Sequence, residues 1–239
     1  DITSAYSSDK VRAVKRSFVF LNNQDADCPA TLFVYDYVNS RNTSYKKYFL
    51  LHTIEEPTIG TKTYDISRTF SGQSGYLHCK ALAPSDAVVG KVGGNGHEFD
   101  VFGTNYPNEV SSDNAGEIGA WRVEVTAAAG RKEDKFLNVI EVASSSKSYI
   151  NTAKLSYTDS FACASYRNNL VFFSKKSVLE STENSFTLSS ATKVLITDLA
   201  SGNWRIVSDE GYNTLFNVKA GENIISAQLP AGKYTMRKE

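Results

Sequence analysis

Residues 31–38 read "TLFVYDYV", and the fold class follows from how their side chains alternate. Alternate side chains of an extended strand point to opposite sides, so Leu32, Val34 and Asp36 share one face while the residues between them share the other. Phe33, Tyr35 and Tyr37 on that second face belong to the aromatic class that is enriched in strands. The stretch therefore predicts a β-strand.

Segments of the same character continue along the chain, separated by short polar or glycine-rich turns, and no long window shows a helical period. The turn "NSRNTS" (39–44) predicts a long hairpin between 31–38 and 45–54. "AAAGRKED" (127–134) is expected to form a second, exposed hairpin tip. The fold class is therefore all-β: an antiparallel β-sandwich, super-sandwich-like, with a smaller C-terminal β-sheet portion. The other expected strands are 17–21, 62–70, 76–82, 116–127, 135–143, 169–174, 185–190, 193–199 and 203–208.

A small, polar segment divides the chain: "ASSSKSYINT" at 143–152. We expect residues 1–143 to form the main sandwich and residues 144–239 a smaller portion packed on it. Gly202, Gly221 and Gly232 stand at strand corners of this second portion, where they would adopt a positive φ without steric cost.

The charge of the chain limits its partners. The 239 residues carry 26 Lys and Arg and 26 Asp and Glu, mixed along the sequence, so a basic groove for nucleic acid or a polybasic membrane patch is not expected. No apolar run approaches the roughly 18 residues of a membrane helix. Three scattered cysteines, Cys28, Cys79 and Cys163, are expected to be buried apolar side chains, although two of them would suffice for one disulfide.

The densest cluster of functional residue types is "KVGGNGHEFDVFGTNY", residues 91–106. It lacks the glycine order and the Lys-Ser/Thr pair of phosphate loops, and no helix is predicted after it. Alternation separates His97 from Glu98 and from Asp100, so we predict neither a metal site nor a cofactor. The glycines at 93, 94 and 96 are expected to close a tight hairpin between 87–92 and 98–103.

Loops at the end of a sandwich are common ligand-binding positions. His97, Asn105 and Tyr106 are therefore candidate substrate-binding residues that would contact a sugar, with a solvated turn as the alternative. In "GAWRVEV" (119–125), Trp121 is expected in the core, and Arg122 and Glu124 on the other face are expected to enter a cross-strand ion pair.

The order of several segments resembles the C-terminal half of the heparinase II/III-like polysaccharide lyases over residues 1–143, with a plausible continuation through the terminal sheet. The segments that carry the resemblance are "DITSAYSSDKVRAVKRSFVFL", "TLFVYDYVNS", "KKYFLLHTIEEP", "GYLHCKALAPSDAVVGKVGGNGHEFDVFGTNYP", "GAWRVEV" and "DKFLNVIEV".

The resemblance implies a secreted or periplasmic enzyme that cleaves uronic-acid-containing polysaccharides, such as glycosaminoglycans, by β-elimination. It implies an N-terminal helical toroid as partner domain and an acidic polysaccharide as partner of the parent enzyme. The family's catalytic Asn, Tyr and His and its metal ligands precede the segment that matches "AYS", so no catalytic or metal-binding residue is assigned here. His52 ends a central strand in the resemblance; it is either a core histidine or a fourth substrate-binding candidate that faces the cleft.

The first functional hypothesis is therefore a β-sandwich portion of such a lyase, which braces the helical catalytic domain, lines part of its cleft and is not active alone. The alternative is a free-standing carbohydrate-binding or adhesin-like module. A third possibility is a lyase whose catalytic part is a separate chain of the same assembly.

Overall fold

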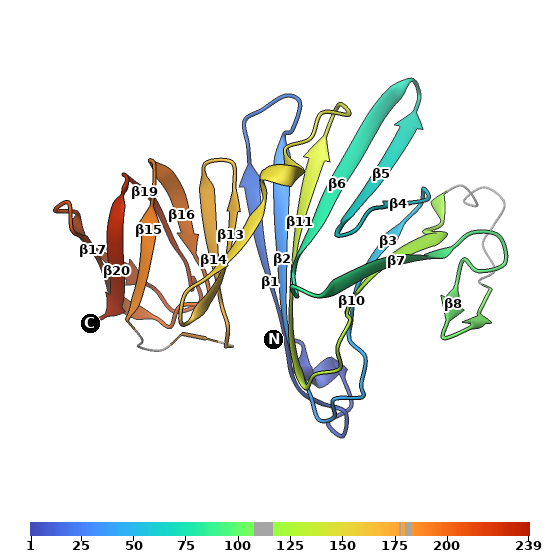
Figure 1. Cartoon of the computed structure of the whole chain (residues 1–239), viewed down its shortest axis with the longest axis horizontal. Helices are drawn as coiled ribbons and strands as arrows, with labels where there is room; N and C mark the ends of the chain where they lie inside the picture. Colours follow the sequence, from blue (N-terminus) through green and yellow to red (C-terminus); the bar gives the residue numbers. More distant parts are fainter. Residues whose placement is uncertain (108–116, 177, 180–182) are drawn as a thin grey trace. The chain divides into compact units, whose positions relative to one another are not determined.

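The computed structural model describes residues 1–107, 117–176, 178–179 and 183–239, which form two compact units, Asp1–Asn151 (unit 1) and Thr152–Glu239 (unit 2) (Figure 1). Strands dominate both units, and the described residues contain no α-helix, which confirms the all-β prediction. How the second unit packs on the first stays a prediction.

Unit 1 is a sandwich of a six-stranded and a three-stranded sheet, and all its strand pairs are antiparallel. The six-stranded sheet has the order β1-β2-β11-β6-β5-β4, and the three-stranded sheet has the order β3-β10-β7. A separate short hairpin is formed by β8 and β9. The elements are η1 (Thr3–Ala5), β1 (Val11–Asn22), β2 (Ala30–Ser40), β3 (Tyr48–Thr53), β4 (Thr58–Ile59), β5 (Thr63–Phe70), β6 (Gln73–Ala83), β7 (Ala87–Gly93), β8 (Asp100–Val101), β9 (Thr104–Asn105), β10 (Trp121–Ala127), β11 (Glu133–Ala143) and η3 (Ile150–Thr152).

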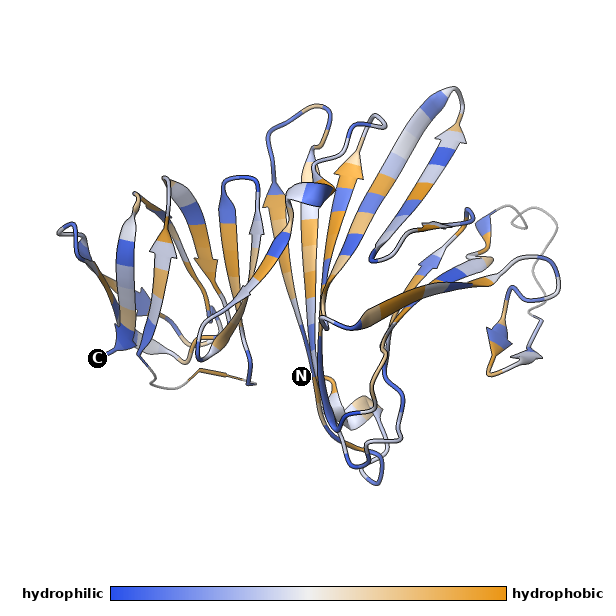
Figure 2. Cartoon of the chain, viewed as in Figure 1, coloured by the Kyte–Doolittle hydropathy of each residue, from blue (hydrophilic) through white to orange (hydrophobic). Residues whose placement is uncertain are grey.

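The core of this sandwich lies between its two sheets, where apolar side chains of alternate positions meet. Val34 and Phe136 come from the six-stranded sheet, and Phe49, Val123 and Val125 come from the three-stranded sheet. Apolar and polar residues alternate along many of the strands (Figure 2). The alternation read from residues 31–38 thus decides which side chains enter the core.

Unit 2 is a second sandwich, of a five-stranded sheet (β12-β13-β14-β16-β19) and a four-stranded sheet (β15-β20-β17-β18). Its strands pair antiparallel except β14 and β16, which are parallel. Trp204, with no exposed surface, lies in its core. Gly202, Gly221 and Gly232 have φ values of 130°, 87° and 153°, as predicted. The strands are β12 (Lys154–Tyr157), β13 (Phe161–Tyr166), β14 (Asn169–Ser174), β15 (Asn184–Leu188), β16 (Thr192–Ile196), β17 (Gly202–Ser208), β18 (Asn213–Val218), β19 (Ile225–Leu229) and β20 (Gly232–Lys238).

The predicted hairpin between residues 31–38 and 45–54 is wrong. β2 pairs with β1 and β11, whereas β3 pairs with β10 in the other sheet. The connecting segment crosses between the sheets because its end is fixed there: the buried ammonium of Lys47 lies 2.9 Å from the carboxylate of Asp134. The crossing delivers Phe49 to the core between the sheets.

The expected hairpin tip at 127–134 is wrong for the same reason, since β10 and β11 belong to different sheets. Arg131 fixes this crossing with two ion pairs, to Asp86 at 2.6 Å and to Asp134 at 2.9 Å.

The expected hairpin at glycines 93, 94 and 96 is also wrong, although all three have positive φ values. β7, which ends at Gly93, pairs with β10 rather than with the following strand. A Cβ on Gly93 would lie 2.3 Å from the carbonyl oxygen of Ala120, and one on Gly94 would lie 3.0 Å from the ring of Trp121. The glycines therefore let Trp121 pack against bare backbone.

Candidate functional site

The outer face of the three-stranded sheet carries the polar cluster that best fits a functional site. Strand register aligns His52 with Arg122, and Leu50 with Glu124, on adjacent strands. Because these residues alternate with the core residues Phe49, Val123 and Val125, they point away from the core. The face therefore presents an imidazole, a guanidinium and a carboxylate side by side.

The β8–β9 hairpin lies against this face. Its two turn residues, Phe102 and Gly103, have φ values of 52° and 86°, as in the type I′ turn that suits a two-residue hairpin. The carboxylate of Asp100 accepts a hydrogen bond from the Gly103 amide at 2.8 Å, and Arg122 donates to the Asp100 carbonyl at 2.9 Å. Arg122 thus ties the hairpin to the sheet.

A cavity of about 360 Å³ separates the hairpin from the sheet, and His52, Arg122, Glu124 and Phe102 help to line it. An adjoining hollow of about 650 Å³ shares Phe102 and is lined further by tyrosines and lysines of unit 1. Phe102 is 92% exposed, so its ring projects between the two hollows instead of filling either. The shape is that of an open groove with an aromatic ridge.

On the sheet side of this groove, the charges of Arg122 and Glu124 compensate each other. Arg122 lies 2.7 Å from Glu124, and the side chain of Arg122 is only 13% exposed. This pair joins two residues of one strand, so the predicted cross-strand pair is wrong. The pKa of Glu98 is lowered by hydrogen bonds from backbone amides, first its own and then that of Gly96, and the Asn105 side chain contributes as well. These hydrogen bonds favour the anionic form of Glu98.

The structure places the four predicted substrate-binding residues in two groups. His52 is exposed on the sheet, so its alternative interpretation as a core histidine is wrong. The other three lie on and beside the hairpin: His97 in the turn before it, Asn105 in β9 and Tyr106 directly after it. Their contact with substrate stays a prediction.

Each member of the hairpin group has a distinct environment. His97 is 67% exposed and lies 3.6 Å from Asp100, although strand alternation predicted different faces; the chain turns here, so alternation does not apply. The Asn105 side chain accepts a hydrogen bond from the Phe99 amide at 2.8 Å and so supports the loop. Tyr106 is 62% exposed and available for contact.

Sequence reasoning did not select Arg122 and Phe102 for this site. The sequence predicted that Arg122 points away from the core, because it alternates with the apolar Trp121 and Val123. Only the fold brings His52 beside it. No sequence pattern around Phe102 predicted its exposure, because that exposure depends on where the β8–β9 hairpin lies.

The described residues contain no group of three or more His, Cys, Asp or Glu side chains arranged for a metal ion.

The three cysteines are buried, as predicted. Burial raises the pKa of Cys79 well above its ordinary value and that of Cys163 to about 12, so these thiols stay protonated near neutrality. Within the described chain, no helix has the length and apolar character needed to cross a bilayer.

Comparison with known families bears on unit 2. Residues 155–238 match the family described as the heparinase II C-terminal domain. The match confirms the resemblance to the C-terminal region of a heparinase II/III-like lyase, and it spans nearly all of unit 2. It does not extend over residues 1–143, where the resemblance was drawn from segment order and stays a prediction. The comparison with curated proteins gives no match.

Proposed function

We propose that this chain is the C-terminal β-sheet portion of a heparinase II/III-like lyase that cleaves uronic-acid-containing polysaccharide by β-elimination. In this proposal the chain braces a helical catalytic domain, lines part of its cleft and has no activity alone. The parent enzyme acts in the periplasm or outside the cell. The match of residues 155–238 to the heparinase II C-terminal domain carries the proposal.

The bracing role is supported by exposed aromatic side chains in unit 1. Phe18 and Phe20 of β1 are 61% and 66% exposed, and Phe70 of β5 is 68% exposed. Phe18 and Phe20 share the face of the six-stranded sheet that elsewhere packs on the three-stranded sheet, because they align with Val34 and Leu32. Large apolar side chains in such positions commonly mark an interface, and a helical domain would cover them.

The role in the cleft is supported by the groove at His52 and Arg122. Elimination next to a uronate carboxylate needs a base and a group that neutralises the carboxylate. Arg122 is engaged by Glu124 at 2.7 Å, so we assign it to shaping the wall rather than to the reaction. The base and the neutralising group would come from the helical domain.

The test compares residues 1–239 with the native product, whose mass and N-terminal sequence are determined first. We expect a longer native product, with a helical region ahead of "DITSAYS", that produces the ultraviolet absorbance of an unsaturated uronate from heparin, heparan sulfate or alginate. Residues 1–239 alone should produce none.

Two results would contradict the proposal. A clear rise in absorbance that depends on residues 1–239 alone would refute the lack of independent activity. A native product that begins near Asp1 would refute the lyase assignment and favour the free-standing carbohydrate-binding module.

A further inference from the structure

Unit 2 has a polar face that the proposed function does not use: the outer face of its four-stranded sheet. Side chains of this sheet alternate between the core, where Trp204, Ile206, Tyr234 and Met236 lie, and solvent. The solvent side holds hydroxyl, amide and basic groups on neighbouring strands. Among the described residues of this face, the one large exposed hydrophobic side chain is Leu215.

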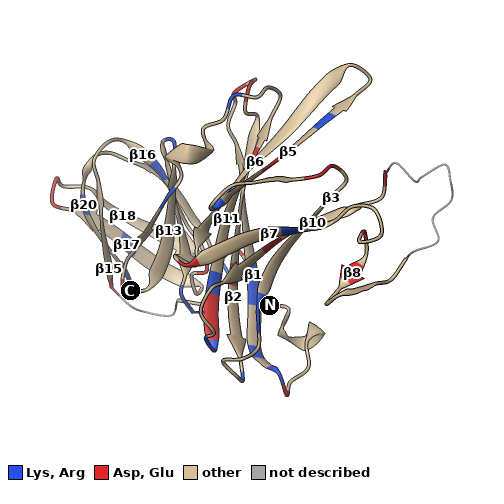
Figure 3. Ribbon diagram, turned by 45° about the vertical axis from the view of Figure 1, so that its right-hand side comes forward, with Lys and Arg blue, Asp and Glu red and all other residues tan. Residues whose placement is uncertain are grey.

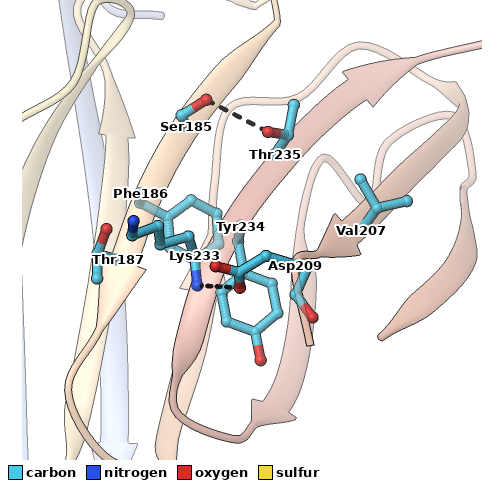
Figure 4. A pocket seen from close by; sticks show the side chains of 9 residues that line it. Ser185, Phe186, Thr187, Val207, Asp209, Lys233, Tyr234 and Thr235 are labelled. Carbon is cyan, nitrogen blue, oxygen red and sulfur yellow. Dashed lines mark hydrogen bonds between the residues drawn. The ribbon is translucent and has the colours of Figure 1, made fainter. Parts of the chain in front are cut away.

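One end of this face is hollowed by a cavity of about 520 Å³ (Figure 4). The hydroxyls of Ser185 and Thr235 face each other across β15 and β20 at 3.4 Å. Thr187 is aligned with Lys233 on the same two strands. At the far side Asp209 accepts a hydrogen bond from the Lys233 amide at 2.9 Å. The hollow therefore offers several hydrogen-bonding groups, one ammonium group, that of Lys233, and one carboxylate, that of Asp209, which the Lys233 amide engages.

The ammonium of Lys233 is the least compensated charge of this face. Its side chain is exposed, and it makes no hydrogen bond or ion pair with any residue that the structure describes. Farther along the same strand, Arg237 lies 4.0 Å from Glu183, with both side chains more than half exposed, and Glu239, whose pKa it helps Arg205 to lower, is the other carboxylate that it faces. Exposed pairs of this kind contribute little, so Arg237 remains open to a stronger acceptor.

The neighbouring strand shows how this face holds a carboxylate. Arg205 lies directly opposite Arg237, an arrangement that is unfavourable unless an anion compensates it. Arg205 donates from its Nε and, at 3.0 Å, from a terminal nitrogen to the two oxygens of Glu239. Asn213 accepts a further hydrogen bond from Arg205 at 2.8 Å and fixes the guanidinium. A two-point contact of this kind is what guanidinium offers to any carboxylate.

We propose that this face binds an acidic polysaccharide along β20. Lys233 and Arg237 are four residues apart on one side of the strand, so their Cα atoms are separated by about 13 Å. Carboxylates of the glycan would pair with these two cations, and its hydroxyls would bond to Ser185, Thr187 and Thr235. A surface without exposed aromatic rings suits charged sugars better than neutral ones, which need apolar platforms. The choice of a uronate glycan rests on the proposed function.

The test measures binding of an alginate oligosaccharide to residues 1–239 by calorimetry and by amide chemical shifts. The double variant K233A/R237A should bind at least about tenfold more weakly, a loss of about 1.4 kcal/mol. The matched control K193A/K219A removes the same charge from exposed positions, Lys193 in β16 of the other sheet and Lys219 in the loop after β18, and should bind as the unchanged chain does.

A second pair of variants tests the carboxylate site directly. E239Q releases Arg205 and should strengthen alginate binding several-fold, whereas E222Q, which removes the same charge beside Lys219, should not. A cellulose oligosaccharide of equal length should bind weakly or not at all.

The inference is overturned if amides of β15, β17 and β20 do not shift, if both double variants lose the same affinity, or if the cellulose oligosaccharide binds as well as alginate. These outcomes are separate from the lyase test. Alginate binding at this face together with an inactive native product would refute only the proposed function. An active native product without binding at this face would refute only the inference.

Discussion

The two units have the same architecture, a β-sandwich around an apolar core, but their surfaces differ in how many large hydrophobic side chains they expose. Each is a sandwich with an apolar core, yet all but three of the exposed large hydrophobic side chains among the described residues lie in unit 1. The exceptions in unit 2 are Tyr157, Leu215 and Ile224. Basic and acidic residues are interspersed in both (Figure 3). Unit 1 therefore has the surface expected of a part that contacts protein, and unit 2 has the more polar surface expected of a part that contacts solvent or sugar.

The two tryptophans give this comparison its largest expected effect. Trp204 is fully buried and donates to the Ala200 carbonyl at 2.9 Å, so Trp204→Ala should destabilise unit 2 by about 3–5 kcal/mol. Trp121, which was expected in the core, is instead partly exposed, with Lys91 over its ring at 5.5 Å, so Trp121→Ala should cost only about 1–2 kcal/mol in unit 1. Denaturant unfolding, monitored by hydrogen exchange of the amides in each unit, measures the loss of unfolding free energy in both variants. Equal losses would show that the two sandwiches do not differ in this respect.

The next effect concerns the ion pairs that hold the two crossings of unit 1. Asp134 is 2% exposed and bonds to both Lys47 and Arg131. Asp134→Ala leaves the buried ammonium of Lys47 without its partner, so we expect a loss of about 3 kcal/mol in the unfolding free energy. The control is Asp27→Ala, which breaks an exposed pair with Lys147 and should cost less than about 1 kcal/mol. A similar cost for both would mean that this network does not stabilise the crossings.

These ion pairs also explain what the sequence could and could not predict. Alternation identified most strands and the inward side chains, because it is a local property of the backbone. Strand pairing depends on contacts between residues far apart in sequence, such as Lys47 and Asp134, which lie together where the chain crosses into and out of the sheet of β3 and β10. Prediction of the candidate site was affected most, because only the pairing of β3 with β10 brings His52 beside Arg122.

A smaller effect should appear as a pH dependence. The Arg131 guanidinium, followed by the Ala129 amide, holds the pKa of Asp86 below its usual value. A depressed folded-state pKa means that the stabilisation is complete above the unfolded pKa of about 3.9 and is lost as the pH falls through the folded value. Asp86 is partly exposed, so the contribution is modest. Unfolding measured from neutral to acidic pH should show a shallower acid-side loss in Asp86→Asn; an unchanged slope would exclude Asp86 as a source.

The smallest effect on stability should come from the residue that most distinguishes unit 1. Phe102 is 92% exposed at the tip of a hairpin that Arg122 anchors, so its ring adds little to folding. Phe102→Ala should change the unfolding free energy of residues 1–239 by less than about 0.5 kcal/mol. If the proposed function holds, the same change in the native product should lower lyase activity, because the ring, which makes few contacts in the isolated unit, would pack against the helical domain or the glycan. Tyr157→Ala, at an exposed aromatic of unit 2, is the matched control and should leave activity unchanged. If both variants keep full activity, the exposed ring of Phe102 has no role in the parent enzyme, and the surface contrast between the units has no functional meaning at this position.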